Sequence, residues 1–263
     1  MVSMIVCIKQ VIDPEAPVSL FKIDPEAKRA IPPKGTPPVL SPFDENALEA
    51  ALRIKDTEGG KITVISMGPR LAKPILRESL AVGADELILL EDEAFEVFDS
   101  YTTAYILATA IRKIGEYDLI LCGRQASDTD AGQVGPVIAE LLGIPSITVA
   151  RRIEAGNGKV KVERLVSDGY QVIEVPMPAL VTASFEVGIL REASAVASVT
   201  AAKKPITIWK AEDLGVEPSA MGRSKLLELF MPEKESKCQM VEGETEEEAG
   251  ANLALKLKES KII

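Results

Sequence analysis

The stretch of residues 119–143, LILCGRQASDTDAGQVGPVIAELLG, decides the fold class. It opens with a continuous apolar run at residues 119–122, passes through a loop of small and polar side chains, and ends in an apolar helical pattern closed by Gly143. Continuous apolar runs of this length are typical of strands that are buried on both faces of a parallel sheet. The stretch therefore predicts a strand, a loop and a helix in succession, the repeating unit of an α/β fold.

The same unit recurs through the first 150 residues. Further apolar runs predict strands at residues 4–8, 62–67, 87–90 and 147–149. Helical spacing of apolar side chains predicts helices at residues 43–57, 71–82, 102–114 and about 131–142. Ser41 as N-cap and Pro42 at the first helical position mark the start of the first helix. This alternation predicts a doubly wound, Rossmann-like parallel sheet.

The pattern changes after residue 150. Residues 159–164 and 171–175 alternate or are rich in β-branched side chains, and Gly156-Asn157-Gly158 is a hairpin-type turn, so we expect a small antiparallel hairpin. Residues 179–182 predict a further strand. Residues 233–248 are mostly acidic and indicate a solvated linker, and residues 249–257 predict a terminal amphipathic helix. We expect a core domain at residues 1–183 and an extended C-terminal arm at 184–263.

A proline-rich segment interrupts the alternation. Residues 14–42 hold eight of the seventeen prolines, a density that forbids a long helix. A short motif occurs twice there, as Ile12-Asp13-Pro14-Glu15-Ala16 and as Ile23-Asp24-Pro25-Glu26-Ala27. The simplest interpretation is two similar turns. Loops of this length are usually functional or mobile.

Composition excludes several classes of function. The chain has 263 residues and a net charge of −10, whereas nucleic-acid backbones require a basic footprint. Histidine is absent, which excludes Ser-His-Asp and Cys-His nucleophile systems and most zinc or non-haem iron sites. The three cysteines are Cys7, Cys122 and Cys238, without a CxxC pair, so we expect no metal site and no disulfide framework. We expect no membrane span, no signal peptide at residues 1–11 and a cytoplasmic location.

Four segments follow the predicted strands, at the sheet edge where open α/β folds bind ligands. They are residues 7–10, 41–44, 67–69 and 123–135. The last has three glycines and leads into a helix, whose backbone N–H groups and dipole make an anion cradle. Arg124, Ser127 and Thr129 supply further donors for a phosphate. The alternative is a structural loop in which Asp128 or Asp130 simply caps the helix, and neither GxGxxG nor a P-loop is present.

Individual residues in these segments admit two interpretations each. Lys9 pairs with a phosphate or is a solvated lysine at a strand end. Cys7 and Cys122 are expected as core thiols, and Met67 as a packing residue. Asp44 and its neighbour Glu45 are explained by the helix dipole. The sequence contains no credible set of nucleophile and general base.

Taken together, these motifs resemble the β subunit of electron transfer flavoproteins over nearly the whole chain. The resemblance is carried by residues 7–13, 41–44, 66–69, 81–85, 123–136 and 178–182, and by the signature-like stretch 162–182. It implies an α/β fold of the adenine-nucleotide-binding type. It also implies an α-subunit partner that carries the main FAD, and a nucleotide in this subunit, which is AMP in ordinary carriers or a second FAD in electron-bifurcating ones.

The family's binding positions transfer to the strand ends identified above. They are Cys7, Ser41, Pro42, Phe43, Asp44, Met67, Gly123, Arg124, Gln125, Ala126, Ser127, Asp128, Thr129, Asp130, Ala131, Gly132, Gln133 and Val134. Lys9 joins them as a phosphate partner. The chain departs from the family at Ser41, where asparagine is common, and at Thr129 and Ala131-Gly132.

The resemblance also implies partners. A loop near residues 188–199 would dock a flavin-dependent dehydrogenase through Arg191, Glu192, Ala195 and Val196, although Ala195 replaces a familiar leucine anchor. The segment 123–136 is more similar to the bifurcating branch of the family than to the AMP-binding branch. The similarity lies at its two ends, Gly123-Arg124-Gln125 and Gln133-Val134-Gly135-Pro136. In the bifurcating branch a flavin accepts a hydride from NADH and splits its electrons. A single-FAD carrier with AMP here, or an adenine-nucleotide sensor module, is the alternative. We expect residues after Ser184 to reach across to the α subunit.

Overall fold

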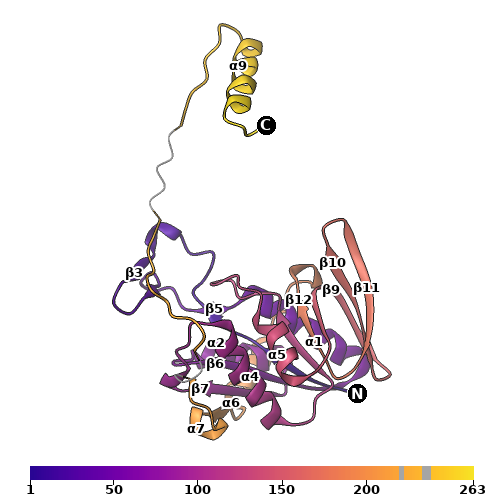
Figure 1. Cartoon of the computed structure of the whole chain (residues 1–263). Helices are drawn as coiled ribbons and strands as arrows, with labels where there is room; N and C mark the ends of the chain where they lie inside the picture. The colour runs from indigo at the N-terminus through magenta and orange to yellow at the C-terminus, as the bar shows by residue number, and fades with distance from the viewer. Residues whose placement is uncertain (219–221, 233–237) are drawn as a thin grey trace. The chain divides into compact units, whose positions relative to one another are not determined.

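A nine-stranded sheet runs through the larger of the two compact units of the chain (Figure 1). The computed structural model describes residues 1–218, 222–232 and 238–263. It divides into two units, unit 1 at Met1–Glu228 and unit 2 at Leu229–Ile263, and the sheet belongs to unit 1. The strand order is β11-β10-β9-β12-β8-β1-β6-β7-β13.

The parallel part of the sheet contains the expected strands and one more, β13, which the sequence does not predict. Its members are β1 Val2–Cys7, β6 Gly60–Gly68, β7 Glu86–Glu91, β8 Leu119–Gly123, β12 Ala179–Ala183 and β13 Thr207–Trp209. β8 and β12 are buried along their whole length, which explains their uninterrupted apolar sequence. β9, Ser146–Gly156, pairs parallel with β12 and antiparallel with β10, so it joins the two parts of the sheet.

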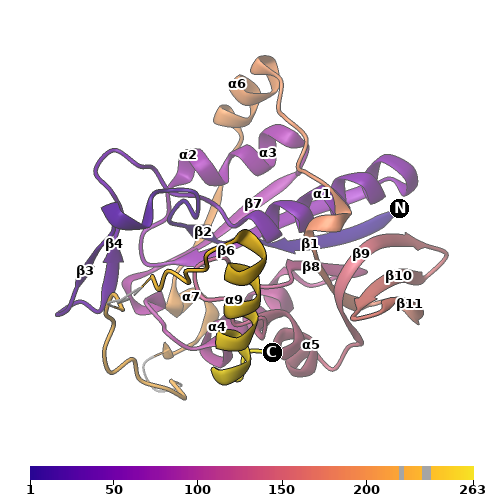
Figure 2. The same cartoon turned by 90° about the horizontal axis from the view of Figure 1, so that it is seen from above.

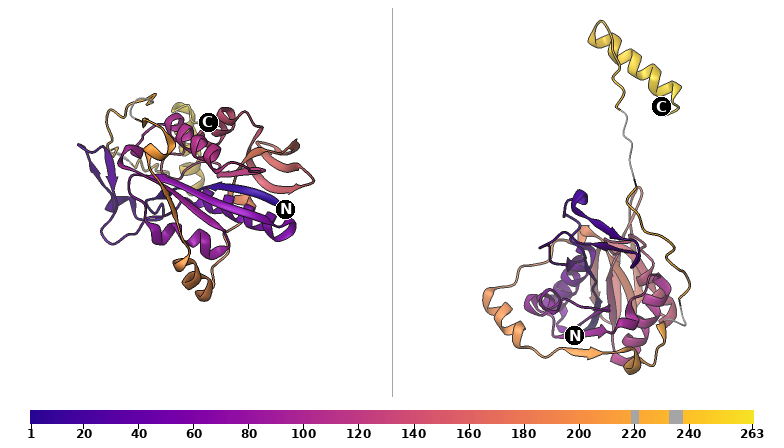
Figure 3. Two further views of the ribbon diagram at one scale, coloured as in Figure 1. Left: turned by 90° about the horizontal axis from the view of Figure 1, so that it is seen from below. Right: turned by 90° about the vertical axis from the view of Figure 1, so that its left-hand side faces the viewer.

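Helices cover both faces of the sheet (Figures 2 and 3), which confirms the doubly wound fold. One face carries α1 Pro42–Glu58, α2 Lys73–Leu76, α3 Glu78–Val82 and α6 Ala195–Lys203. The other carries α4 Ser100–Ile114, α5 Val134–Leu142 and α7 Ala211–Leu214. Short 3-10 turns lie at Val18–Leu20 (η1), Glu93–Phe95 (η2) and Phe185–Val187 (η3).

The strand order reverses between β1 and β8. From β1 the chain moves outward to β6 and β7, and then returns through α4 to β8 on the other side of β1. Cys7 and Cys122 are register partners at the carboxyl ends of these two strands. Loops that leave neighbouring strands in opposite directions open a crevice, which is where open α/β sheets bind ligands.

Two helices differ from the expectation. The helix expected at residues 71–82 is broken at Arg77 into α2 and α3, and the Ser79 hydroxyl donates to the Leu76 carbonyl at 2.7 Å beside the break. The helix expected from about residue 131 begins at Val134. Asp130 (φ 50°) and Gly132 (φ 63°) have left-handed backbone, which a right-handed helix excludes.

The antiparallel strands beyond residue 150 match the expected hairpin. They are β10 Lys159–Val166 and β11 Gly169–Pro176. Asn157 (φ 53°) and Gly158 (φ 75°) form the two-residue turn between β9 and β10. Positive φ at both positions is the requirement of a type I′ hairpin, which asparagine and glycine meet with little strain.

The proline-rich segment forms two small antiparallel pairs. β2 Gln10–Val11 pairs with β5 Val39–Leu40, and β3 Lys22–Asp24 pairs with β4 Arg29–Ile31. The two copies of the repeated motif are similar turns, as expected. The Asp13 carboxylate accepts the Glu15 N–H at 2.9 Å, and that of Asp24 accepts the Glu26 N–H at 3.1 Å.

The chain beyond β12 contributes to both units. Residues 184–218 supply η3, α6, β13 and α7 to unit 1, so the division expected at residue 183 stays a prediction. Unit 2 contains the expected terminal helix, α9 Glu246–Glu259. α9 begins three residues early because the Thr245 side chain accepts the Glu248 N–H and three glutamates favour the positive helix end. The acidic linker therefore ends at residue 245, and residues 233–237 of it lie outside the described residues.

Two absences hold for the described residues. None of the helices there is long and apolar enough to cross a membrane. Within the same residues, no group of three or more metal-ligating side chains comes together.

Candidate functional site

Four segments meet at the carboxyl ends of β1, β6 and β8. The Ser41 N–H donates to the Lys9 carbonyl at 2.8 Å, and the Ile8 N–H donates to the Ile65 carbonyl at 2.9 Å. The Gln10 side chain donates to the Arg70 carbonyl at 2.7 Å and accepts the Ala72 N–H at 2.6 Å. These bonds hold residues 7–10 against residues 41–44 and against the chain on either side of residues 67–69.

The Asp44 carboxyl group ties two of these segments together. One of its oxygens accepts the Lys9 N–H at 2.8 Å, and the other accepts the Gly123 N–H at 3.0 Å. Asp44 therefore spans the crevice between β1 and β8 and fixes the spacing of their ends. Asp44 also lies in the first turn of α1, where the helix dipole favours a carboxylate, as the sequence suggests.

Burial changes the acidity of this carboxyl group. Desolvation raises the pKa of Asp44 from 3.8 to about 7, although the hydrogen bonds from Gly123 and Lys9 and the charge of Lys9 oppose the shift. A carboxyl group with this pKa exchanges its proton near neutral pH. It therefore gives the site a titratable group at its base.

The loop at residues 124–133 is held by its own polar contacts. Lys9 Nζ contacts the Asp128 carboxylate at 2.7 Å, and the Gln125 amide donates to Asp130 at 2.7 Å. The N-cap residue of α5 is Gln133, and no side chain caps this helix. The interpretation of Asp128 or Asp130 as the cap of α5 is therefore wrong. Lys9 forms an ion pair with Asp128 and thereby ties the loop at residues 124–133 to the end of β1.

Arg124 lies against aromatic rings. Its guanidinium carbon is 4.7 Å from the centroid of the Phe43 ring and 6.0 Å from that of Phe185. Its Nη1 is 3.5 Å from the Ser184 hydroxyl. Rings on the guanidinium fix its plane and leave its edge available to an anion.

Four buried polar atoms at these strand ends lack a hydrogen-bond partner within the described part of the chain. They are Ser41 Oγ, Ser66 Oγ, Arg124 Nε and Ser127 Oγ. Ser41 and Ser66 are fully buried. A buried hydroxyl without a partner is unfavourable, and native proteins usually satisfy such groups with water or a ligand. Three hydroxyls and a guanidinium N–H are the donors that a nucleotide with its phosphates requires, so the site fits such a group.

Close packing at the site depends on two glycines. A Cβ atom at Gly123 would lie 2.5 Å from Asp44 Oδ1 and 2.7 Å from the Phe43 carbonyl carbon. A Cβ atom at Gly135 would lie 2.7 Å from Thr182 Cγ2. Both glycines therefore allow a helix start to approach a strand end. The first-turn amides of α5 consequently lie next to the crevice.

The two cysteines of the site are core thiols, as expected. Cys7 and Cys122 are buried, unpaired and neighbours in register. A hydrogen bond with Cys7, together with burial, raises the pKa of the Cys122 thiol well above its usual value. Met67 is half-buried and packs on the same core. Ligand contact by these three residues stays a prediction.

The remaining predicted binding residues lie around the crevice. Pro42 is exposed at the first position of α1, and Phe43 is half-buried beneath Arg124. The others are the half-buried Ala126 and Val134 and the exposed Thr129, Ala131, Gly132 and Gln133. The Ala126 carbonyl accepts the Thr129 and Asp130 N–H groups at 3.3 and 2.9 Å, and ligand contact by these residues stays a prediction.

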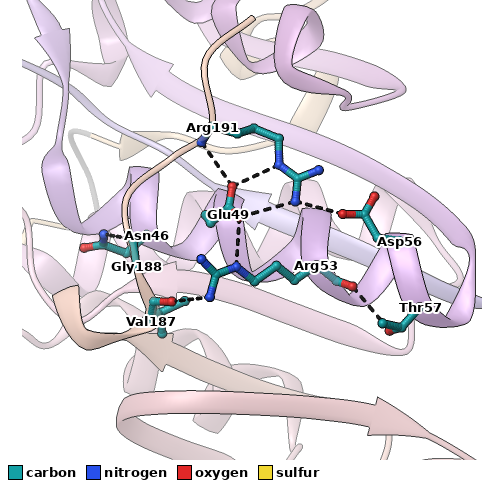
Figure 4. Close-up of polar contacts among 8 residues, drawn as sticks. All are labelled: Asn46, Glu49, Arg53, Asp56, Thr57, Val187, Gly188 and Arg191. Atoms are coloured by element: carbon teal, nitrogen blue, oxygen red, sulfur yellow. Dashed lines mark hydrogen bonds and ion pairs between the residues drawn. The ribbon is translucent and has the colours of Figure 1, made fainter.

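The residues predicted to dock a partner protein lie in a separate segment (Figure 4). Arg191 is bound to Glu49 and Asp56 on α1. Glu192 is exposed, and Ala195 and Val196 are exposed in the first turn of α6. The structure therefore does not bring these residues together with those at the strand ends.

Sequence reasoning missed three residues of the site. Ser66 and Gln10 stand inside the quoted motifs, but their side chains were not singled out. Their signal was their position, because each lies at the end of a strand or just beyond it. Phe185 lies against Arg124 although it is 61 residues further along the chain, and no local pattern indicates that contact.

Comparisons with known proteins agree with this architecture. Residues 34–214 match the family described as the electron transfer flavoprotein domain. The chain is 42% identical over 266 residues to the electron transfer flavoprotein subunit beta of Thermoanaerobacterium thermosaccharolyticum, covering 99% of this chain and 100% of the relative. It is 42% identical over 265 residues to the caffeyl-CoA reductase-Etf complex subunit CarD of Acetobacterium woodii, covering 99% of each. The acryloyl-CoA reductase electron transfer subunit gamma of Anaerotignum propionicum is 40% identical over 185 residues, 67% of this chain and 65% of the relative.

Proposed function

The chain belongs to the electron transfer flavoprotein family, among its beta subunits, and from this premise we propose that it binds FAD in the crevice between β1 and β8. It does so as one half of a complex with an alpha subunit. The observation that carries the proposal is that four buried polar atoms of these segments have no hydrogen-bond partner among the described residues. These atoms would hydrogen-bond the phosphates and ribose of an adenine nucleotide.

The chain's own residues would hold the nucleotide at several points. Arg124 offers a positively charged edge to a phosphate, and the first-turn amides of α5 and the Ser127 hydroxyl add donors. Lys9 keeps the loop in place through Asp128, and Asp44 fixes the spacing of the crevice. FAD, when bound, supplies the redox chemistry, and the protein positions it and tunes its surroundings.

We propose that the complex bifurcates electrons from NADH. Support comes from the end-to-end similarity to a subunit named for a caffeyl-CoA reductase-Etf complex. The resemblance to the bifurcating branch at both ends of the segment 123–136 also supports this proposal. These ends are Gly123-Arg124-Gln125 and Gln133-Val134-Gly135-Pro136. The alternative is a single-FAD carrier with AMP in this subunit. A flavin-dependent acyl-CoA dehydrogenase or reductase is the proposed electron acceptor.

The thiols fit a cytoplasmic location for this complex. All three cysteines are unpaired, and Cys238 is exposed. Exposed free thiols persist where the surroundings are reducing.

Nucleotide release tests the proposal. The chain is co-expressed with its alpha subunit, the purified heterodimer is denatured, and the released nucleotides are quantified by chromatography. Two FAD per heterodimer is the expected result. One FAD and one AMP would contradict bifurcation but keep nucleotide binding at this site, and a heterodimer without flavin would contradict the whole proposal.

A further inference from the structure

A buried carboxylate on α1 holds the chain segment that leaves η3 (Figure 4). Glu49 is 4% exposed, yet it carries no contact with the nucleotide site. Its carboxylate accepts the Arg191 backbone N–H at 3.1 Å and the Arg191 Nε at 3.1 Å. It also accepts Arg53 Nε at 2.8 Å. A buried carboxylate with two guanidinium partners is rarely placed without a specific positional role.

Further bonds from α1 reach the same segment. Arg53 Nη1 donates to the Val187 carbonyl at 2.6 Å, and the Asn46 amide donates to the Gly188 carbonyl at 2.7 Å. Arg191 Nη2 pairs with Asp56 at 2.8 Å. We call Asn46, Glu49, Arg53 and Asp56 the α1 clamp. It binds the segment at residues 187, 188 and 191.

Gly188 allows the segment to lie on the clamp. Its φ of 124° is a conformation that other residues rarely adopt, and a Cβ atom there would lie 2.5 Å from Arg53 Nη2. The local backbone is therefore shaped for this contact.

A second anchor holds the far end of the segment. Arg77 Nη1 donates to the carbonyls of Ala201 and Lys204 at 2.7 and 2.8 Å, and Lys204 Nζ donates to the Ala84 carbonyl at 3.0 Å. The segment 188–204 is thus fixed at both ends.

The segment between these anchors exposes apolar side chains. Ile189 is 89% exposed, Val196 is 77% exposed and Val199 is 61% exposed. Large apolar side chains that a folded chain leaves in water next to rigid anchors mark an interaction surface. This surface lies where the family resemblance implies dehydrogenase docking, and the inference rests on that proposed function.

We propose that Glu49 is a positioning residue for electron transfer, which holds the segment 188–204 so that its exposed apolar side chains meet the partner reductase in one fixed conformation. In this proposal Arg191 fixes the segment through its bonds to Glu49 and Asp56, and it does not contact the partner reductase directly. Burial alone would raise the pKa of Glu49, but the hydrogen bonds from Arg191 and Arg53 outweigh this effect and lower it. The clamp is therefore charged at neutral pH.

Glu49→Gln tests the clamp, since glutamine keeps the volume but turns one acceptor oxygen into a donor that faces two guanidinium groups. The heterodimer with the alpha subunit is compared with a Glu86→Gln variant, which removes a surface pair with Lys61 (2.7 Å) away from the segment. Hydrogen–deuterium exchange at residues 189–194 is expected to accelerate about tenfold in Glu49→Gln and to be unchanged in Glu86→Gln. Unchanged exchange in both variants would overturn the proposal.

Electron transfer supplies the functional readout. The probe is the caffeyl-CoA reductase of Acetobacterium woodii, because the Etf subunit of its complex is 42% identical to this chain. Glu49→Gln is expected to raise the KM for this reductase about tenfold and to leave kcat within about twofold. Because Glu49 is buried and cannot touch the reductase, such a rise must act through the segment. An unchanged KM would overturn the positioning role.

A second variant guards against misfolding of Glu49→Gln. Asn46→Ala removes only the bond to the Gly188 carbonyl and leaves no charge unpaired. Alanine also has a high helix propensity, so α1 should stay folded. Asn46→Ala is expected to accelerate hydrogen–deuterium exchange at residues 189–194 and to raise the KM, each by a smaller factor than Glu49→Gln does. Slower exchange or a lower KM would contradict the role of the α1 clamp. Nucleotide content should match the wild type in every variant. A wild-type heterodimer that lacks flavin or does not reduce the probe would contradict the proposed function, whereas the exchange measurement tests the clamp separately.

Discussion

Asp44 joins fold and site through a single carboxyl group. It accepts backbone N–H groups from the ends of β1 and β8, and burial raises its pKa to about 7. The unfolded chain ionises this group near pH 3.8, whereas the folded chain keeps the proton up to about pH 7. Between those values the folded state binds more protons, so stability that is present at low pH is lost as the pH rises through 7.

Asp44→Asn removes this titration while Oδ1 keeps one of the two N–H partners. We expect the melting temperature of the wild type to fall relative to that of Asp44→Asn between pH 5 and pH 8, as measured by circular dichroism. Lys9 and Asp128, the charged groups nearest to Asp44, are identical in both proteins, so their effects cancel in the difference. Melting curves that shift in parallel across this range would contradict the raised pKa.

The Ser66 hydroxyl distinguishes a binding role from a structural one. It is fully buried and has no partner in the described residues, so its removal costs the fold nothing. We expect Ser66→Ala to leave the free energy of unfolding unchanged or to raise it by about 1 kcal/mol, because it removes a buried hydroxyl without a partner. If the hydroxyl bonds the nucleotide, the variant should weaken binding by about 0.5–1.5 kcal/mol, which titration calorimetry measures.

Ser79 is the matched control for this prediction. It is equally buried, but its hydroxyl donates to the Leu76 carbonyl at 2.7 Å. Ser79→Ala should therefore lower stability and leave nucleotide affinity unchanged. The idea fails if Ser66→Ala behaves like Ser79→Ala in the two measurements.

At the scale of elements, α5 shows what local sequence can predict. The apolar run of β8 and the closing Gly143 identify a strand and a helix without any alignment. The start of α5 was misplaced because Asp130 and Gly132 adopt left-handed backbone, and neither residue type requires it. The segments that form the site were therefore predictable from strand ends, whereas the loop conformation was not.

Contacts between distant elements were beyond sequence reasoning for a similar reason. β12 lies between β8 and β9 although β9 precedes it by 23 or more residues, and strand order depends on the packing of the whole sheet. The bond of Arg191 to Glu49 spans 142 residues. The spacing of residues in the sequence predicts which side chains are neighbours on one helix or strand. It does not predict contacts between residues that are far apart in the sequence.

Gly135 makes the approach of α5 to the sheet a testable feature. An alanine methyl group there would lie 2.7 Å from Thr182 Cγ2 and 3.4 Å from Leu180 Cδ2. Both neighbours belong to the buried strand β12, so α5 must shift. We expect Gly135→Ala to lose about 1–3 kcal/mol of unfolding free energy and to lower the nucleotide content of the heterodimer.

Gly250 in α9 provides the comparison. A Cβ atom at that position meets nothing within 4 Å. Gly250→Ala should therefore be neutral or stabilising, because alanine favours a helix by about 1 kcal/mol over glycine. Equal effects of the two substitutions on denaturant unfolding would show that the close approach of α5 is not required.

The whole molecule has a well-packed unit 1 and a unit 2 with little core of its own. α9 has no buried residue, and Leu253 and Leu255 on it are about half-exposed, 47% and 59%. Phe230 and Met240, at 65% and 81%, are exposed as well. A single helix of 14 residues is marginal in water by itself, so a surface that covers its apolar side chains would stabilise it. We propose that the alpha subunit supplies that surface.

Removal of residues 229–263 tests this assignment. Because the sheet and both of its helical layers lie in unit 1, we expect the truncated chain to keep the thermal unfolding transition of the full chain. Size-exclusion chromatography after co-expression should show loss of the heterodimer. In the full chain, Leu255→Ala should weaken the heterodimer, whereas Lys258→Ala, an exposed charge on the same helix, should not. A truncated chain that still co-elutes with the alpha subunit would place the subunit interface on unit 1, and the exposed side chains of unit 2 would then require another partner.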